Sequence, residues 1–183
     1  MVVSSNGVPE RDFSREAMHV QGTPITRVRC GRDHDRVVSF TVGENLVQMR
    51  DRRFRPSFQE IPSPGGVRDV AFGGNWLAVA SGDLAVSVYD TRSDVWATAV
   101  FRLGPLPQPV RRLAISPDGS RLAASCDDGA IHLWALVADT ALEVLSIRGE
   151  ATTGLAFSPS GQSLAAAGMN DVVILGALPR TAD

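Results

Sequence analysis

The sequence of 183 residues contains no lysine, and all 18 of its basic residues are arginine. This bias is typical of a high-GC genome, such as a bacterial one, and carries little functional information. The formal net charge of −2 argues against a generally basic surface for nucleic acid, although it leaves room for a local basic patch. No apolar run reaches the roughly 18 to 20 residues that span a bilayer. We therefore expect neither nucleic acid nor a membrane as a partner.

Cysteine and histidine are also scarce. The two cysteines, Cys30 and Cys126, are too few for a disulfide framework, and we expect small buried thiols in a reducing, cytoplasmic protein without a signal peptide. The histidines His19, His34 and His132 have no metal-ligand spacing. The sequence also lacks a G-x-S-x-G elbow and a glycine-rich phosphate loop. We predict no catalytic, cofactor-binding or metal-binding residues, and no enzymatic activity.

The sequence does contain an internal repeat. Residues 110–134 read VRRLAISPDGSRLAASCDDGAIHLW, and more degenerate copies begin at Ile25, Val67 and Thr152. The copies follow one another at a period of about 42 to 43 residues. A period of this length, made of short strands and turns, predicts an array of small sheets.

Each copy has the same internal order. In the clearest one, polar turns at 116–119 and 127–129 separate apolar strands, and a looser fourth strand follows. Proline presets φ in the first turn, aspartate bonds its own backbone, and glycine tolerates positive φ. The predicted strands cover residues 110–115, 121–125, 131–134 and 142–147. The pattern predicts an all-β protein with little or no helix.

These residues resemble the WD40 repeat family over positions 25 to 178, most specifically in the SPDG turn at 116–119 and the segment 128–134. The resemblance implies a WD40-like β-propeller with about four blades of four antiparallel strands. The expected blades cover 25–66, 67–109, 110–151 and 152–178. A strand near 16–21 would complete the last blade, and tails are expected at 1–15, disordered or extended, and at 179–183.

The resemblance also implies a polar network inside each blade, formed by an aspartate, a serine or threonine, a tryptophan and a histidine. Three residues of the clearest copy match it, namely Ser125, Asp128 and Trp134. A weaker set in the preceding copy is Ser81, Asp83 and Tyr89. The family's histidine before the first strand is absent from every copy. We therefore expect no blade to have the complete network.

Four blades leave the closure of the ring open, because propellers have about four to eight blades. The chain could close alone as a strained ring of four. Two chains could instead associate head to tail into an eight-bladed homodimer. The third possibility is an open array that needs a partner to cover its terminal blades.

The resemblance implies a non-enzymatic scaffold for protein–protein interactions, with a protein or peptide as the partner. The alternative is a partial propeller, or the sensor or assembly arm of a larger multidomain signalling protein. First strands line the channel of a propeller, and arginine suits bidentate binding of carboxylate or phosphate. Arg68 and Arg111 share one repeat position at the start of first strands, and Arg27 and Arg112 share the next, so these four arginines are the candidate partner-binding residues.

Overall fold

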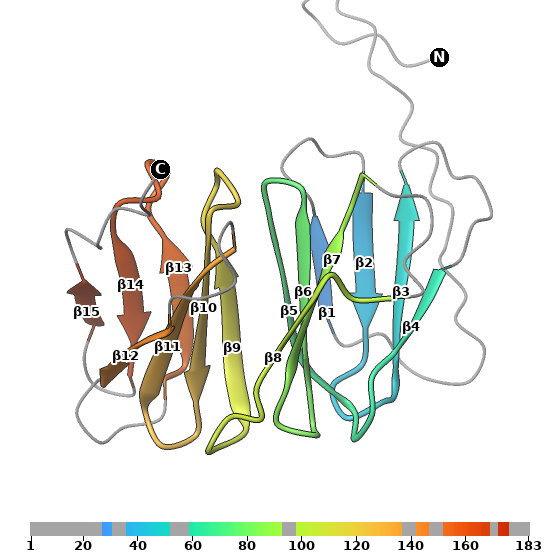
Figure 1. The fold of residues 1–183 in the computed structure, drawn as a ribbon, viewed down its shortest axis with the longest axis horizontal. Helices are drawn as coiled ribbons and strands as arrows, with labels where there is room; N and C mark the ends of the chain where they lie inside the picture. The colour runs from blue at the N-terminus through green and yellow to red at the C-terminus, as the bar shows by residue number, and fades with distance from the viewer. Residues whose placement is uncertain are drawn as a thin grey trace, which may run out of the picture.

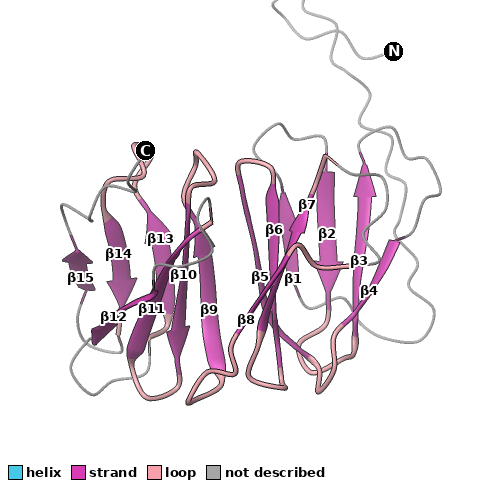
Figure 2. Cartoon of the chain, viewed as in Figure 1, coloured by secondary structure: helices cyan, strands magenta, loops and turns pink. Residues whose placement is uncertain are grey.

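The computed structural model describes residues 27–30, 36–51, 59–92, 98–136, 142–146, 152–168 and 172–175. All regular elements in these ranges are strands, and none is a helix (Figure 2). The predicted all-β fold of antiparallel blades is confirmed. No helix in the described ranges has the length and apolar character needed to cross a membrane.

The strands form four antiparallel sheets that follow one another along the chain (Figure 1). The first sheet contains β1 (Arg27–Cys30), β2 (Arg36–Phe40), β3 (Leu46–Asp51) and β4 (Gln59–Pro62). The second contains β5 (Val67–Gly73), β6 (Trp76–Ser81), β7 (Val86–Asp90) and β8 (Phe101–Leu103). The third contains β9 (Val110–Ile115), β10 (Arg121–Cys126), β11 (Ala130–Ala135) and β12 (Leu142–Ser146). The fourth contains β13 (Gly154–Phe157), β14 (Leu164–Ala167) and β15 (Val172–Leu175).

The turn between β9 and β10 shows why this sequence makes a sharp hairpin. The Gly119 amide donates to the carbonyl oxygen of Ser116 at 2.9 Å, and Gly119 has a φ of 77°, which glycine adopts without steric cost. The carboxylate of Asp118 accepts hydrogen bonds from the backbone amide and the hydroxyl of Ser120. Residues 116–119 therefore fix the register of the two strands.

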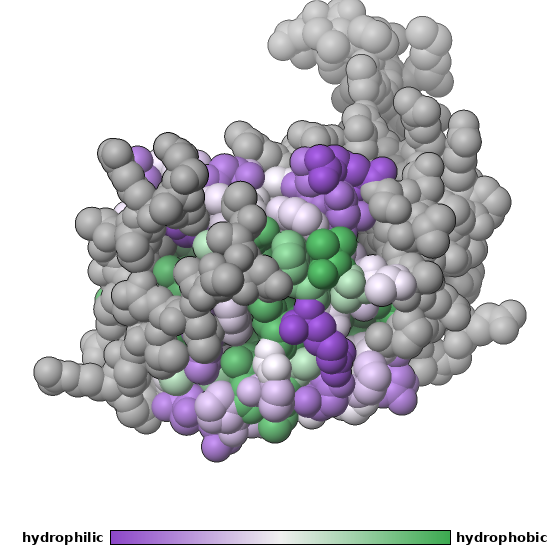
Figure 3. Space-filling view, viewed as in Figure 1, coloured by the Kyte–Doolittle hydropathy of each residue, from purple (hydrophilic) through white to green (hydrophobic). Residues whose placement is uncertain are grey.

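The hydrophobic core lies between successive sheets. The three clusters join the first sheet to the second, the second to the third, and the third to the fourth. Small side chains on the second strands let the sheets approach, among them Ala78, Ala80, Ala123 and Ala124, all fully buried. Apolar residues gather near the centre of the viewed face, where a strongly hydrophilic group also lies between them, and further hydrophilic residues lie toward the upper and lower rims (Figure 3). The packing of these alanines between the sheets outweighs the low propensity of alanine for strands.

The four sheets form an open row in the described residues. The first sheet and β15 lie at opposite ends of the molecule (Figure 1). The fourth sheet contains three described strands, and no described strand pairs with the outer edge of β15. The strand expected near 16–21, which would complete this sheet, and the tails expected at 1–15 and 179–183 lie outside the described residues.

Candidate functional site

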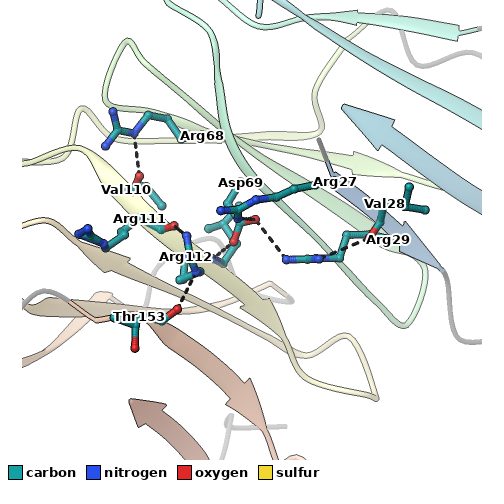
Figure 4. A network of polar contacts seen from close by, with 10 residues as sticks. Arg27, Val28, Arg29, Arg68, Asp69, Val110, Arg111, Arg112 and Thr153 are labelled. Carbon is teal, nitrogen blue, oxygen red and sulfur yellow. Dashed lines mark hydrogen bonds and ion pairs between the residues drawn. The ribbon is translucent and has the colours of Figure 1, made fainter. Parts of the chain in front are cut away.

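The first strands of the first three sheets bring arginine side chains together (Figure 4). Strand β5 lies beside both β1 and β9, so that residues about 42 positions apart in the sequence become neighbours. Five arginines form what we call the arginine cluster, namely Arg27, Arg29, Arg68, Arg111 and Arg112. The cluster contains all four arginines that were candidates from the sequence.

Asp69 is the buried anion of the cluster. Its carboxylate is 1% exposed, and its Oδ1 atom lies 3.3 Å from Nη1 of Arg27 and 3.5 Å from Nη2 of Arg29. Its Oδ2 atom accepts a hydrogen bond from the Leu113 amide at 2.9 Å. This single carboxylate on β5 therefore joins β1 to β9, and with them three sheets.

Arg29 and Asp69 were not candidates from the sequence. Arg29 stands two residues after Arg27, and alternate residues of a strand share a face. Asp69 occupies the repeat position at which the neighbouring copies carry Arg27 and Arg112. An aspartate at a repeat position where both neighbouring copies carry arginine was the sequence signal that could have predicted an ion pair here.

Asp127 is the exposed anion of the cluster, in the turn between β10 and β11. Its Oδ2 atom lies 3.0 Å from Nη2 of Arg68, and its Oδ1 atom lies 3.7 Å from Nη1 of Arg111. Nε of Arg68 also donates to the carbonyl oxygen of Val110 at 3.0 Å. Asp127 and both arginine side chains are more than one-third exposed, so solvent screens these ion pairs.

Arg112 differs from the other members of the cluster. It donates from Nε to the carbonyl oxygen of Thr153 at 2.8 Å and from Nη1 to that of Arg111 at 2.7 Å. No acidic side chain of the described residues forms an ion pair with it. Burial lowers the pKa of its guanidinium, and the charge of Arg27 lowers it further, while Asp69 opposes them. The cluster therefore has five guanidinium groups against two carboxylates.

The residues expected to form the network of the third blade lie in the third sheet without hydrogen bonds between them. The Oγ atom of Ser125 is buried and has no hydrogen-bond partner among the described residues. Oδ1 of Asp128 accepts from the Ala130 amide at 3.0 Å, which stabilises the turn. The indole of Trp134 stacks on the ring of His132, with 5.9 Å between the ring centroids.

The weaker set lies in the second sheet and also makes separate contacts. Ser81 accepts a hydrogen bond from Ser63 at 3.0 Å between the two Oγ atoms. Asp83 forms a salt bridge with Arg102. Burial raises the pKa of the Tyr89 phenol, whose hydrogen bond with Ser87 opposes the rise. These residues therefore stabilise strands and turns individually.

Titratable groups outside the arginine cluster do not converge on a common point. The described residues hold no group of three or more histidine, cysteine, aspartate or glutamate side chains placed to bind a metal ion. His132 is buried, and its Nδ1 atom has no hydrogen-bond partner in the described ranges. Cys126 is a buried free thiol whose pKa is raised to about 11, first by burial and then by Asp128 and Asp127.

Comparison with known families agrees with the geometry of the third sheet. The family model described as WD domain, G-beta repeat matches residues 100–135, which run from β8 to the end of β11. A search of the curated proteins finds no match. This part of the chain is therefore similar to a WD40 repeat, and repeats of that family generally mediate protein–protein interactions.

Proposed function

We propose that this protein is a non-enzymatic scaffold for protein–protein interactions, in which a second copy of the chain completes the row of blades. The similarity of residues 100–135 to a WD40 repeat supports the scaffold role. The outer face of the fourth sheet, on which no other described sheet packs, supports the pairing. Two chains joined head to tail would form a closed ring of eight blades, and such heterologous contacts close when the rotation permits.

The outer face of the fourth sheet carries the observation on which this proposal depends. Leu164 and Ala166 of β14 point toward the third sheet and are buried. Residues directly opposite one another in an antiparallel pair share a face. The opposite face therefore carries small apolar residues, namely Ala156, Ala165, Ala167 and Val172. The side chains that pack the sheets elsewhere in this protein are of the same kind, so this face suits another blade.

Light scattering of the purified protein tests the pairing. We expect a mass of about 39 kDa, which is twice the 19.5 kDa of one chain. Val172 is 69% exposed on β15, and a charge placed there has to be desolvated if the face is covered. The Val172→Lys variant should therefore have the mass of one chain.

Val100 supplies the matched control, because it is 53% exposed and lies beside β8 in the second sheet. The Val100→Lys variant should keep the mass of the unmodified protein. A stable, well-behaved species of 19.5 kDa for the unmodified chain would contradict the paired ring. It would favour the alternative, in which this chain is one arm of a larger signalling assembly.

A further inference from the structure

The arginine cluster is open to solvent on the first strands of three sheets. The side chains of Arg27, Arg29, Arg68 and Arg111 are 29%, 42%, 37% and 39% exposed. Each guanidinium has five donors in a planar fork, and the contacts in this structure use only some of them. A positively charged surface of this kind lies on a protein whose net charge is −2. The cluster is therefore a local feature that the overall charge does not explain.

The anions inside the cluster show which chemistry its geometry accepts. Both are carboxylates. Asp69 pairs with two arginines of the first sheet, and Asp127 lies between Arg68 of the second sheet and Arg111 of the third. Asp69 is buried and also accepts a backbone amide, so it belongs to the core. The side chain of Asp127 is 39% exposed, and the arginines that pair with its carboxylate are themselves exposed. An external carboxylate could therefore take the place of Asp127 on Arg68 and Arg111.

We infer that the arginine cluster binds an extended acidic segment of a partner protein through its glutamate or aspartate carboxylates. The inference rests on the proposed scaffold role and names its ligand. The arginines lie on three separate strands, so they suit several carboxylates along a chain better than one compact anion. Asp69 and Asp127 within the cluster repel a doubly charged phosphate more strongly than a carboxylate. Arg112, which has no acidic partner among the described residues, supplies a further cation.

Fluorescence anisotropy with a labelled peptide of eight glutamates tests the inference. We expect saturable binding that weakens as salt is added, because exposed charges are screened. The Arg111→Glu and Arg112→Glu variants should each weaken binding by about tenfold or more. Arg92→Glu is the matched control, since Arg92 is 67% exposed and pairs with Asp90 outside the cluster. Equal loss in the Arg92 variant would overturn the assignment.

Asp127→Asn is the second variant, and it predicts a gain rather than a loss. Removing this carboxylate frees Arg68 and Arg111, so octaglutamate should bind several-fold more tightly. A gain cannot result from misfolding. Unchanged or weaker binding by this variant would refute the exchange of carboxylates. Tighter binding of a single-stranded RNA or a phosphorylated peptide of equal length would show that the ligand is a phosphate and overturn the inference.

The Val172→Lys variant separates this inference from the proposed pairing. The arginine cluster lies within one chain, on β1, β5 and β9, whereas Val172 lies on β15. Octaglutamate should therefore bind this variant as it binds the unmodified protein. Retained binding with a loss of pairing supports the cluster as a site of the single chain. Loss of both would contradict the inference that one chain carries the site.

Discussion

Replacement of Ser125 by alanine should stabilise the protein. Ser125 is fully buried in β10, and within the part of the chain that the structure describes its Oγ atom has no hydrogen-bond partner. Ala123, two residues earlier on the same face of β10, is also fully buried, so this face accepts alanine. The substitution keeps Cβ and removes only the hydroxyl oxygen.

The magnitude follows from two opposing terms. An unsatisfied buried hydroxyl costs about 1 to 3 kcal/mol of stability, which the substitution recovers. The cavity that the oxygen leaves is smaller than a methyl group, and a packing defect of that size lowers stability by less than about 1 kcal/mol. We therefore expect the free energy of unfolding to rise by about 1 to 2 kcal/mol. For a domain of this size, each kcal/mol corresponds to about 2 to 4 °C in Tm.

Urea denaturation followed by circular dichroism measures the change. Ser116→Ala is the matched control, because Ser116 is also fully buried but uses its hydroxyl twice. Its Oγ atom accepts from the Arg121 amide at 2.9 Å and donates to Asp118. This control should lose about 1 to 2 kcal/mol. A loss of 1 kcal/mol or more in Ser125→Ala would refute the reasoning, since it would mean that the hydroxyl makes a stabilising contact.

Three further predictions concern single positions. Gly82→Ala should cost more than about 3 kcal/mol, because its Cβ would clash with the Gly65 backbone, whereas Gly154→Ala should change stability by less than about 1 kcal/mol in the same urea assay. Burial lowers the pKa of His132, with Asp128 opposing it, so the unfolded chain binds more protons below pH 6.5. The contribution of neutral His132 to thermal stability should be fully present above pH 6.5 and should be lost as the pH falls toward the pKa of His132 in the folded protein. The His132→Gln variant should lose less stability over this range. In a Cys30→Ser background, Cys126 should react with iodoacetamide at pH 8 at least about 100-fold more slowly in the folded protein than in urea, since burial raises its pKa from 9.0 to about 11. Equal rates in the two states would contradict the buried, raised-pKa thiol.

The strands of the third sheet could be predicted closely from the sequence. The polar turns at 116–119 and 127–129 separate apolar strands, and each observed strand there ends within a residue of its predicted position. Short outer strands were harder to predict. Strand β8 has only three residues, Phe101–Leu103, which is too short for its alternation to predict a strand by itself. It forms because β7 offers an edge, with Val88 paired to Phe101 and Val86 to Leu103.

The arginines could be predicted as a group, but their partners could not. Arg68 and Arg111 share one repeat position and Arg27 and Arg112 share the next, which predicted that the four arginines lie around one mouth of a channel. Asp127 reaches Arg68 across 59 residues of sequence. A contact of this kind depends on how two sheets pack, which no local pattern encodes. Whether the row of sheets closes into a ring likewise depends on the surfaces of the terminal sheets and not on the repeat pattern. The sequence therefore did not distinguish a ring of four blades, a paired ring of eight and an open array.

The location of the core between the sheets determines how this chain can be divided. A cut between Leu103 and Val110 would separate Ala78, Ala80 and Val88 from Leu122 and Ala124, and would expose both halves of one cluster. Every cut between blades has this consequence, because each junction between successive sheets holds one of the three clusters. A fragment released by proteolysis between two blades would therefore expose apolar surface and tend to aggregate.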